Sequence, residues 1–293
     1  MKKLYSDKRV ILTLIAPGLL VFICAILAPI CLSVYYAFTE YSGMGTPVFI
    51  GLRNYVELFH DEAFGRSLFN SFLLALGFIF IQHPIAIVVA AVLDKIGGRA
   101  ESFFRCVYFI PNVISVAVIA YLWKFIYNPD FGLLNNVLHA FGVQESVNFL
   151  SQQTAIYAVL VVLIWHGFGW GMLIYYTGIK NIDPVLYEAA SIDGAGWWKT
   201  FFRITLPLMK PVIKINVTMA IISALKQMET VYLLTGGGPG NSTQFTANYL
   251  YQQAFKAFRY GYGNAIGVVF IIICVSVTVF MNTVFKDKEA ENG

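Results

Sequence analysis

The sequence contains little charge. Asp, Glu, Lys and Arg make up 12% of its 293 residues, whereas soluble proteins carry about 25%. Hydrophobic residues make up 58%, and the mean hydropathy is +0.68. These values exclude an ordinary soluble domain, and a net charge of +4 needs no nucleic-acid partner to explain it. The composition therefore predicts a polytopic membrane protein.

Motifs for catalysis, metal binding and nucleotide binding are also missing. The glycine-rich stretch TGGGPGNST at residues 235–243 lacks both the Lys before Ser/Thr and the preceding strand of a phosphate loop. No nucleophile elbow or metal-ligand spacing occurs. The four cysteines follow no disulfide or metal pattern, so we expect them to be small apolar side chains. We therefore expect no catalytic residue, metal site or cofactor in this chain, and no enzyme activity.

Long apolar runs dominate what is present. A membrane-spanning helix needs about 20 apolar residues. The runs predict an all-α protein with six spans, at residues 11–38, 68–93, 106–127, 154–179, 212–234 and 262–285. The fifth span is placed so that it includes Lys226 and Glu229. The N-terminal run has no small-residue cleavage site, which favours a retained anchor over a secretory signal.

Basic residues predict the orientation of these spans. Lys and Arg concentrate at the N-terminus (residues 1–9), between spans two and three, between spans four and five, and in the tail (residues 286–293). Cytoplasmic segments carry the excess of Lys and Arg in membrane proteins. We therefore expect both termini and residues 183–207 to be cytoplasmic, flanking a transmembrane domain over residues 10–285.

Residues 183–207 form the long polar interruption in the second half of the chain. Asp183 followed by Pro184 predicts a helix start, because the carboxylate can accept from free N–H groups and proline suits the first helical position. Gly194 and Gly196 then break this helix. Residues 197–204 predict a second short helix.

The same segment carries a motif, formed by Glu188, Ala189, Ala190, Gly194, Ile204, Leu206 and Pro207. The motif and its spacing resemble the EAA loop of inner-membrane permease subunits of binding-protein-dependent ABC importers. The resemblance implies that the loop docks in a cleft of an ATPase subunit and transmits the ATPase cycle to the membrane helices. The alternative is an interfacial amphipathic helix without a partner.

The resemblance implies the type I ABC importer permease fold and a set of partners. These are a second homologous permease, two ATPase subunits that bind ATP and magnesium, and an extracytoplasmic solute-binding protein, all at the inner membrane or cell membrane of a bacterium or archaeon. The GGGP segment, YQQAF at 251–255 and YGYGNAIG at 260–267 resemble the carbohydrate subgroup, which implies a sugar or oligosaccharide substrate. Alternatives are a polyol phosphate, a peptide or an amino acid, or an ion-coupled secondary transporter with Lys226 and Glu229 as its coupling pair.

Polar and aromatic residues within two spans are candidates for the substrate pathway. They are Trp165, His166 and Trp170 in span four, and Ser223, Lys226, Gln227, Glu229 and Tyr232 in span five. Charged groups at membrane depth are costly and normally face the bundle interior or a water-filled cavity. The alternatives are a structural Lys226–Glu229 ion pair or a contact of Lys226 with a partner subunit. For the candidate residues in span four, the alternatives are tight helix packing and an aromatic belt at the membrane interface.

Other polar residues within the predicted spans, and two short amphipathic segments, are open to more than one interpretation. His83, between Gln82 and Pro84, is either functional or bonded to a backbone carbonyl that the proline frees. Asn112, next to a proline in span three, predicts a bent helix with an interhelical hydrogen bond. Short amphipathic helices are expected at residues 51–59 and within 128–142, the latter for partner docking or for packing on the membrane surface.

Overall fold

The computed structural model describes residues 8–284. The predicted C-terminal tail and nearly all of the predicted N-terminal segment lie outside these residues. The described chain is mostly helical, with one antiparallel pair of two-residue strands, β1 (Thr39–Glu40) and β2 (Val48–Phe49). It forms two compact units, one of residues up to Asp61 together with Leu250–Ile272, the other of Glu62–Tyr249 together with the residues from Ile273 on.

The first unit contains the N-terminal span. Helix α1 (Lys8–Phe22), the π-helical segment η1 (Ile23–Leu27) and α2 (Ala28–Ala37) form one long apolar helix. The strand pair, α3 (Arg53–His60), the π-helical segment η4 (Gln252–Lys256) and the first half of α16 (Tyr260–Val284) complete the unit. Helix α3 is the amphipathic helix expected at residues 51–59.

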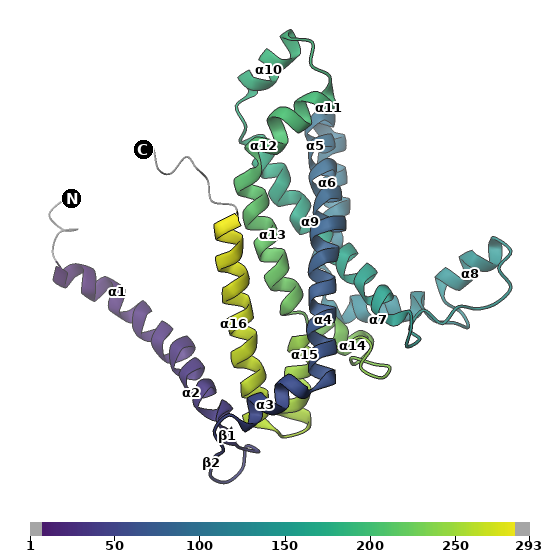
Figure 1. Ribbon diagram of the computed structural model, residues 1–293. Coiled ribbons are helices and arrows are strands. Elements are labelled where there is room, and N and C mark those ends of the chain that lie inside the picture. The colour runs from purple at the N-terminus through teal and green to yellow at the C-terminus, as the bar shows by residue number, and fades with distance from the viewer. Residues whose placement is uncertain (1–7, 285–293) are drawn as a thin grey trace. The chain divides into compact units, whose positions relative to one another are not determined.

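The second unit is a helical bundle. Its elements are α4 (Glu62–Gly77), η2 (Phe78–Gln82), α5 (His83–Ile96), α6 (Gly98–Val113), α7 (Val116–Ile126), α8 (Leu133–Ala140), α9 (Ala155–Lys180), α10 (Pro184–Ile192), α11 (Trp197–Thr200), η3 (Phe201–Thr205), α12 (Leu206–Leu208), α13 (Lys210–Leu225), α14 (Glu229–Leu234) and α15 (Thr246–Tyr251). Helices α5, α6, α9 and α13 run side by side, with α10 and α11 at one end (Figure 1). Ala86 and Ala90 of α5 pack with Met172 and Tyr175 of α9 in the buried core. Helix α8 is the short helix expected within residues 128–142.

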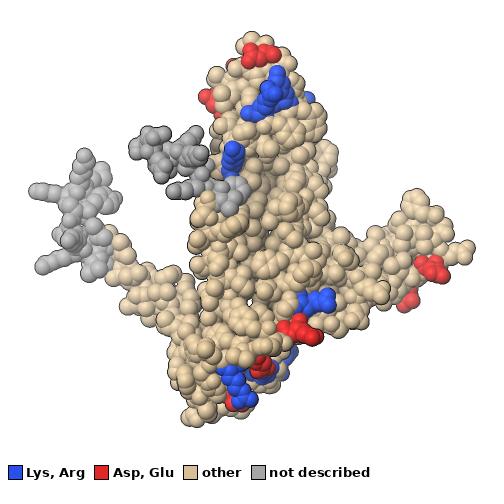
Figure 2. All heavy atoms as spheres, in the orientation of Figure 1, with Lys and Arg blue, Asp and Glu red and all other residues tan. Residues whose placement is uncertain are grey.

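Four helices in the described chain are long and apolar enough to cross a membrane. They are Thr13–Ala37, Glu62–Ile96, Ala155–Lys180 and Tyr260–Thr283, and the number reaches six if each of two bent helix pairs forms one span. On the face drawn in Figure 2, charged side chains lie over α10 and α11, whereas the helices next to them present mostly uncharged surface. An all-α membrane protein with up to six spans is therefore confirmed.

Two predicted spans are interrupted. The third divides into α6 and α7, which meet at 96°, because Ile114 is extended and the Ser115 hydroxyl accepts from Val118 N at 3.3 Å, capping a new helix. The fifth ends at Leu225, and α14 starts at Glu229, so Lys226 and Gln227 lie in a break rather than inside one helix. Non-helical backbone at membrane depth is tolerated where it lines a cavity, and a cavity lies here.

Prolines explain three of the four π-helical segments in the described chain. Pro29, Pro84 and Pro207 each lie two residues after the end of one such segment. A proline cannot donate to the carbonyl four residues earlier, and the residue before each proline bonds instead to the carbonyl five residues earlier. The backbone therefore adapts to the missing donor by a local π-turn. The second of these turns places Gln82 and His83 at the centre of the bundle.

Candidate functional site

A polar cavity of about 260 Å³ lies between η2, α5, α6, α9 and α13 of the second unit. Its lining is Phe78, Gln82, His83, Asn112, Leu163, His166, Gly167, Trp170, Gly171, Asn216, Met219, Ala220, Ser223 and Gln227. Amide, imidazole and hydroxyl groups are present, together with the Trp170 indole, but no Asp, Glu, Lys or Arg is among these described residues. The cavity thus presents several polar groups within a mainly apolar wall and carries no fixed charge.

Several buried polar atoms in this cavity have no hydrogen-bond partner within the described chain. They are Gln82 Oε1, His83 Nε2 and Asn112 Nδ2. Gln82 and His83 are each only 4% exposed. An unsatisfied buried polar atom costs about 1–3 kcal/mol. Groups that both donate and accept hydrogen bonds would satisfy all three, and a ligand would reach these buried atoms after a shift of the surrounding side chains.

Other bonds of the same side chains hold them in place. Gln82 Nε2 donates to the carbonyl of Gly167 at 3.2 Å, and Asn216 Nδ2 donates to the carbonyl of Gly171 at 3.1 Å. The Tyr175 hydroxyl lies 2.8 Å from His83 Nδ1. Gln82, His83 and Asn216 are each anchored by one polar atom, whereas Gln82 Oε1 and His83 Nε2 are buried without a partner in the described chain.

The glycines of α9 allow the close approach that forms this site. A Cβ atom on Gly169 would lie 2.2 Å from the carbonyl oxygen of Tyr108, which is backbone and cannot yield. Helix α6 can therefore approach α9 this closely only because residue 169 lacks a side chain. The approach brings Asn112 to the cavity.

The structure gathers some of the predicted pathway residues and separates others. His166, Trp170, Ser223 and Gln227 line the polar cavity. An adjoining cavity of about 320 Å³ shares His166 and Gln227 with it and is also lined by Lys226 and Glu229. Trp165 instead packs against Trp123, with ring centroids 5.5 Å apart. Trp165 and Tyr232 are absent from the linings described for both cavities.

Lys226 and Glu229 do not form an ion pair among the residues that the structure describes. They are exposed in this chain and belong to different elements, Lys226 as the C-cap of α13 and Glu229 as the first residue of α14. The pairing on one helix face that the sequence suggested is therefore not observed. Their role in transport stays a prediction.

Asn216 is the cavity residue that sequence reasoning missed. It is a single amide inside the apolar run of α13, 3% exposed. A lone polar residue in a membrane span is itself a signal of function, so the position was accessible from the sequence. Gln82, His83 and Asn112 were noted as polar positions, but their convergence requires the fold, and the interhelical hydrogen bond expected of Asn112 is not observed for its Nδ2 in the described chain.

The predicted loop at residues 183–207 has the expected local structure. Asp183 accepts from Val185 N at 3.0 Å, which caps α10. Gly194 follows that helix at φ +68°, a conformation that favours glycine. The second segment runs from Trp197 through Leu208, further than predicted, because Pro207 occupies the first turn of α12.

The motif residues of the loop divide between exposed and inward positions. Glu188, Ala189, Gly194 and Pro207 are exposed, Ile204 and Leu206 are half-buried, and Ala190 is buried. Large apolar side chains are exposed beside the motif, with Ile192 at 86% and Trp198 at 60%. A soluble surface rarely presents such side chains together without a partner.

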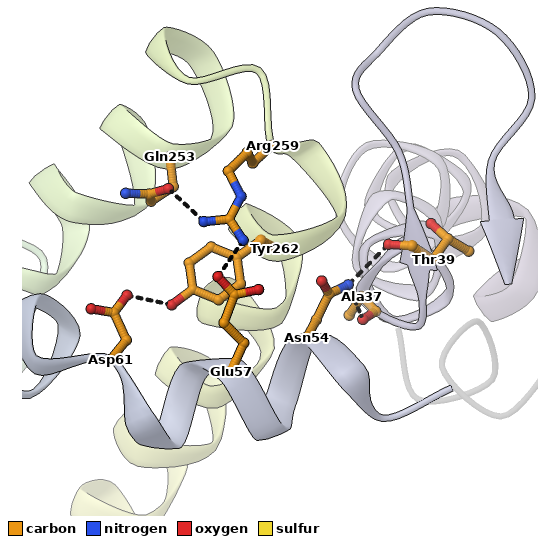
Figure 3. A network of polar contacts seen from close by, with 8 residues as sticks. All are labelled: Ala37, Thr39, Asn54, Glu57, Asp61, Gln253, Arg259 and Tyr262. Atoms are coloured by element: carbon orange, nitrogen blue, oxygen red, sulfur yellow. Dashed lines mark hydrogen bonds and ion pairs between the residues drawn. The ribbon is translucent and has the colours of Figure 1, made fainter. Parts of the chain in front are cut away.

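A second polar network lies in the first unit, around α3 (Figure 3). Glu57 pairs with Arg259 at 2.5 Å, and Asp61 accepts from the Tyr262 hydroxyl. Asn54 donates to the carbonyls of Ala37 and Thr39, at 2.9 Å each. These polar groups are partnered within the unit, in contrast to the cavity atoms.

Comparisons with known proteins agree with this architecture. Residues 82–288 match the family described as "Binding-protein-dependent transport system inner membrane component". The chain is 37% identical to the probable ABC transporter permease protein YurN of Bacillus subtilis (98% of this chain, 99% of that protein). It is 32% identical to the multiple sugar-binding transport system permease protein MsmF of Streptococcus mutans, over 89% of this chain and 90% of that one.

A solved structure shares the fold. It is the bacterial alginate ABC transporter in complex with alginate pentasaccharide-bound periplasmic protein, with a TM-score of 0.85 at 24% identity over 97% of this chain and 96% of that chain. The family match spans well over half of the residues and includes the 183–207 loop and all of the cavity lining except Phe78. The chain therefore belongs to the family of inner membrane components of binding-protein-dependent transport systems.

Proposed function

We propose that this permease imports a carbohydrate, a sugar or an oligosaccharide, and that the polar cavity of the second unit is part of the path. The observation that carries the proposal is the set of unpaired buried atoms beside an aromatic ring: Gln82 Oε1, His83 Nε2, Asn112 Nδ2 and the Trp170 indole. Sugar hydroxyls both donate and accept hydrogen bonds, as these atoms require. Relatives whose names refer to sugar transport support the substrate class.

The proposed assembly contains a second homologous permease, two ATPase subunits that bind ATP and magnesium, and an extracytoplasmic solute-binding protein. The cavity, at about 260 Å³, is slightly smaller than common small-molecule sites, which measure about 300–1,000 Å³. Facing residues of a second permease would complete it. The assembly would lie in the inner membrane or cell membrane of a bacterium or archaeon.

Charge argues against the other substrates. Polyol phosphates, free amino acids and most peptides carry charges, and the lining of the polar cavity holds no charged side chain among the described residues. Moving an unpaired charge into such a site is costly. An ion-coupled secondary transporter is disfavoured because the family is binding-protein-dependent. An uncharged, hydroxylated substrate fits the cavity best.

The 183–207 loop would couple this path to ATP hydrolysis. We propose that it is cytoplasmic, as are both termini, and that α10 docks on an ATPase subunit through its exposed apolar side chains, including Val185 and Ile192. The motif at Glu188, Ala189, Ala190, Gly194, Ile204, Leu206 and Pro207 supports this role. Transport would then proceed by alternating access of the cavity to the two sides of the membrane.

Reconstitution tests the proposal. The complex is purified through this chain, its subunits are identified by mass, and it is placed in proteoliposomes with its binding protein and a panel of radiolabelled neutral oligosaccharides. We expect uptake only when ATP is present on the side of the membrane that the ATPase subunits face. Uptake driven by a proton or sodium gradient without ATP would contradict the importer mechanism. Preferential ATP-driven uptake of a solute that is not a carbohydrate would contradict the substrate class.

A further inference from the structure

A network of charged residues lies at the base of the 183–207 loop. Lys180 Nζ on α9 lies 2.7 Å from Asp94 Oδ1 on α5. The Tyr176 hydroxyl, one turn earlier on α9, donates to Glu101 of α6, and Arg105 Nε lies 3.3 Å from Glu101 Oε1. These five residues, Asp94, Glu101, Arg105, Tyr176 and Lys180, are called the loop-base network below.

The Tyr176 ring is the centre of this network. Arg105 Cζ lies 4.7 Å and Lys180 Nζ 5.5 Å from the ring centroid, within the range of cation–π attraction. Tyr176 is 6% and Glu101 8% exposed, so water screens the contact between them little. The side chains of Lys180 and Arg105 are 47% and 34% exposed, so their ion pairs are screened more. One connected set of contacts thus fastens the ends of α5, α6 and α9 to each other.

The loop is in contact with the helices that the network joins. Asp94 lines a cavity of about 190 Å³ together with Tyr187 of α10 and Thr205 of η3. The Tyr187 hydroxyl lies 3.1 Å from Thr205 Oγ1. Burial, and to a smaller degree the nearby Asp94 carboxylate, raises the pKa of Tyr187, so its hydroxyl keeps its proton.

Apolar contacts fix the second segment of the loop in the same place. Phe201 of η3 and Met209 are buried in one core with Ala91 of α5 and Ile179 of α9. This segment therefore cannot move without displacing α5 and α9 or breaking the core.

The same two helices reach the polar cavity. Tyr175 of α9 precedes Tyr176 and contacts His83, the first residue of α5, through its hydroxyl. His83 Nε2 is one of the unpaired cavity atoms. Tyr176, a member of the loop-base network, and Tyr175, which contacts the cavity residue His83, are therefore neighbours on α9.

We propose that the loop-base network makes the ends of α5, α6 and α9 move as one block with the loop, so that displacement of the loop reaches His83 and the cavity. Its five members are positioning residues, which act through helix geometry and do not touch substrate. The inference rests on the proposed docking of the loop on an ATPase subunit.

Distance measurements on the reconstituted complex test the proposal without any substrate. Spin labels are attached at Lys199→Cys in the loop and Val92→Cys on α5, with the four native cysteines replaced by Ser, and distances are measured by pulsed EPR with and without ATP plus vanadate. We expect one narrow distribution in both states. Asp94→Asn or Lys180→Met should broaden it, and the charge swap Asp94→Lys with Lys180→Asp should narrow it again.

Coupling provides the second readout. In the single variants the ATPase rate should persist, because the exposed docking face is unchanged. Uptake per ATP hydrolysed, measured with a neutral oligosaccharide that the parent complex transports, should fall about fivefold or more, the lower end of typical site-to-site coupling. Tyr176→Phe keeps the ring and removes only the bond to Glu101, so it should give a smaller loss.

The matched control is Arg259→Gln, which removes the partly exposed Glu57–Arg259 pair of the first unit. It should change neither readout. An unchanged narrow distribution in Asp94→Asn would overturn the proposal, as would lost ATPase binding that the charge swap does not recover. Because the distance readout needs no sugar, a failure of carbohydrate import would leave this inference standing, whereas absence of ATPase binding in the parent complex would refute the docking role itself.

Discussion

The polar cavity and the loop-base network lie on the same helices, α5 and α9, but use opposite chemistry. The cavity presents uncharged amide and imidazole groups, and three of its buried atoms lack partners in the described chain. The loop-base network consists of charged groups around one tyrosine; each charge lies in an ion pair, although the buried Arg105 Nε makes no hydrogen bond to another described residue. Unpaired buried groups cost stability and are kept where a ligand can supply the partner. Paired charges instead hold one geometry, so one end of these helices suits binding and the other suits transmission.

The largest effect is expected at Gly169, between the two regions. Gly169→Val would place side-chain atoms against the Tyr108 carbonyl, since a Cβ alone would lie 2.2 Å from it. Helices α6 and α9 would have to separate, disrupting both the cavity and the Glu101–Tyr176 contact. Overpacking costs about 1–3 kcal/mol or more, and we expect loss of the assembled complex in size-exclusion chromatography.

Gly171→Ala is the control for that change. An added Cβ at Gly171 would meet its nearest neighbours at 3.7 Å, ordinary contact. Assembly should remain normal. Equal assembly of the Gly169 and Gly171 variants would show that the close approach of α6 to α9 is dispensable.

The next effect is expected at Gly194, in the loop alone. Gly194→Asp, and more strongly Gly194→Val, forces a side chain into φ +68°, which costs about 1–2 kcal/mol for most residues. The turn between α10 and α11 should shift, so uptake should fall about tenfold while membrane insertion and the cavity stay intact. Uptake and co-purification with the ATPase are measured together.

Gly196 offers the matched comparison two residues later. Its φ is −67°, and a Cβ added there would meet no heavy atom within 4 Å, so Gly196→Ala should leave uptake unchanged. Normal uptake and normal ATPase association in Gly194→Asp would remove the docking assignment of the loop.

Apolar substitutions of unpartnered cavity residues should reduce uptake without reducing thermal stability, unlike substitutions at an ordinary buried polar site. Asn112→Leu deletes an Nδ2 atom that has no partner in the described chain, so thermal stability should be unchanged or slightly higher, whereas Gln82→Leu also removes the bond from Nε2 to the Gly167 carbonyl and should lose about 1 kcal/mol of stability. Uptake should fall about fivefold, as expected for one lost hydrogen bond to the substrate of about 1 kcal/mol. Parallel losses of stability and uptake in Asn112→Leu would mean that this atom serves the fold, and that its unpaired state has no functional meaning.

Local signals in the sequence predicted much of the fold and the loop. The apolar runs predicted the membrane helices, and Asp183 followed by Pro184 predicted the start of α10. Those features depend on residues close in sequence. The break after Leu225 was missed because residues 226–228 contain no proline or glycine that would mark it, and the adjoining cavity that they line is built from several helices.

The cavity itself could be predicted only in part for the same reason. His166, Trp170, Ser223 and Gln227 stood out by type. Whether Trp165 faces the cavity depends on the rotation of α9, which composition does not specify. The π-turn before Pro84 also rotates Gln82 and His83, and only the tertiary packing of α5 on α9 decides what they face.

The smallest effect is expected from Lys226 and Glu229, which line the adjoining cavity without pairing in the described chain. Because no mutual contact is lost, Glu229→Gln alone should leave assembly normal and change uptake or substrate-stimulated ATPase activity only a few-fold, since an amide has half the acceptor capacity of a carboxylate. The double change Lys226→Met with Glu229→Gln separates the two roles. Normal assembly with reduced uptake places these residues beside the path. If Glu229→Gln instead abolishes assembly and the double variant restores both assembly and uptake, the two residues form a structural ion pair in the complete complex, and the charged cavity would then belong with the paired network at the loop base rather than with the binding site.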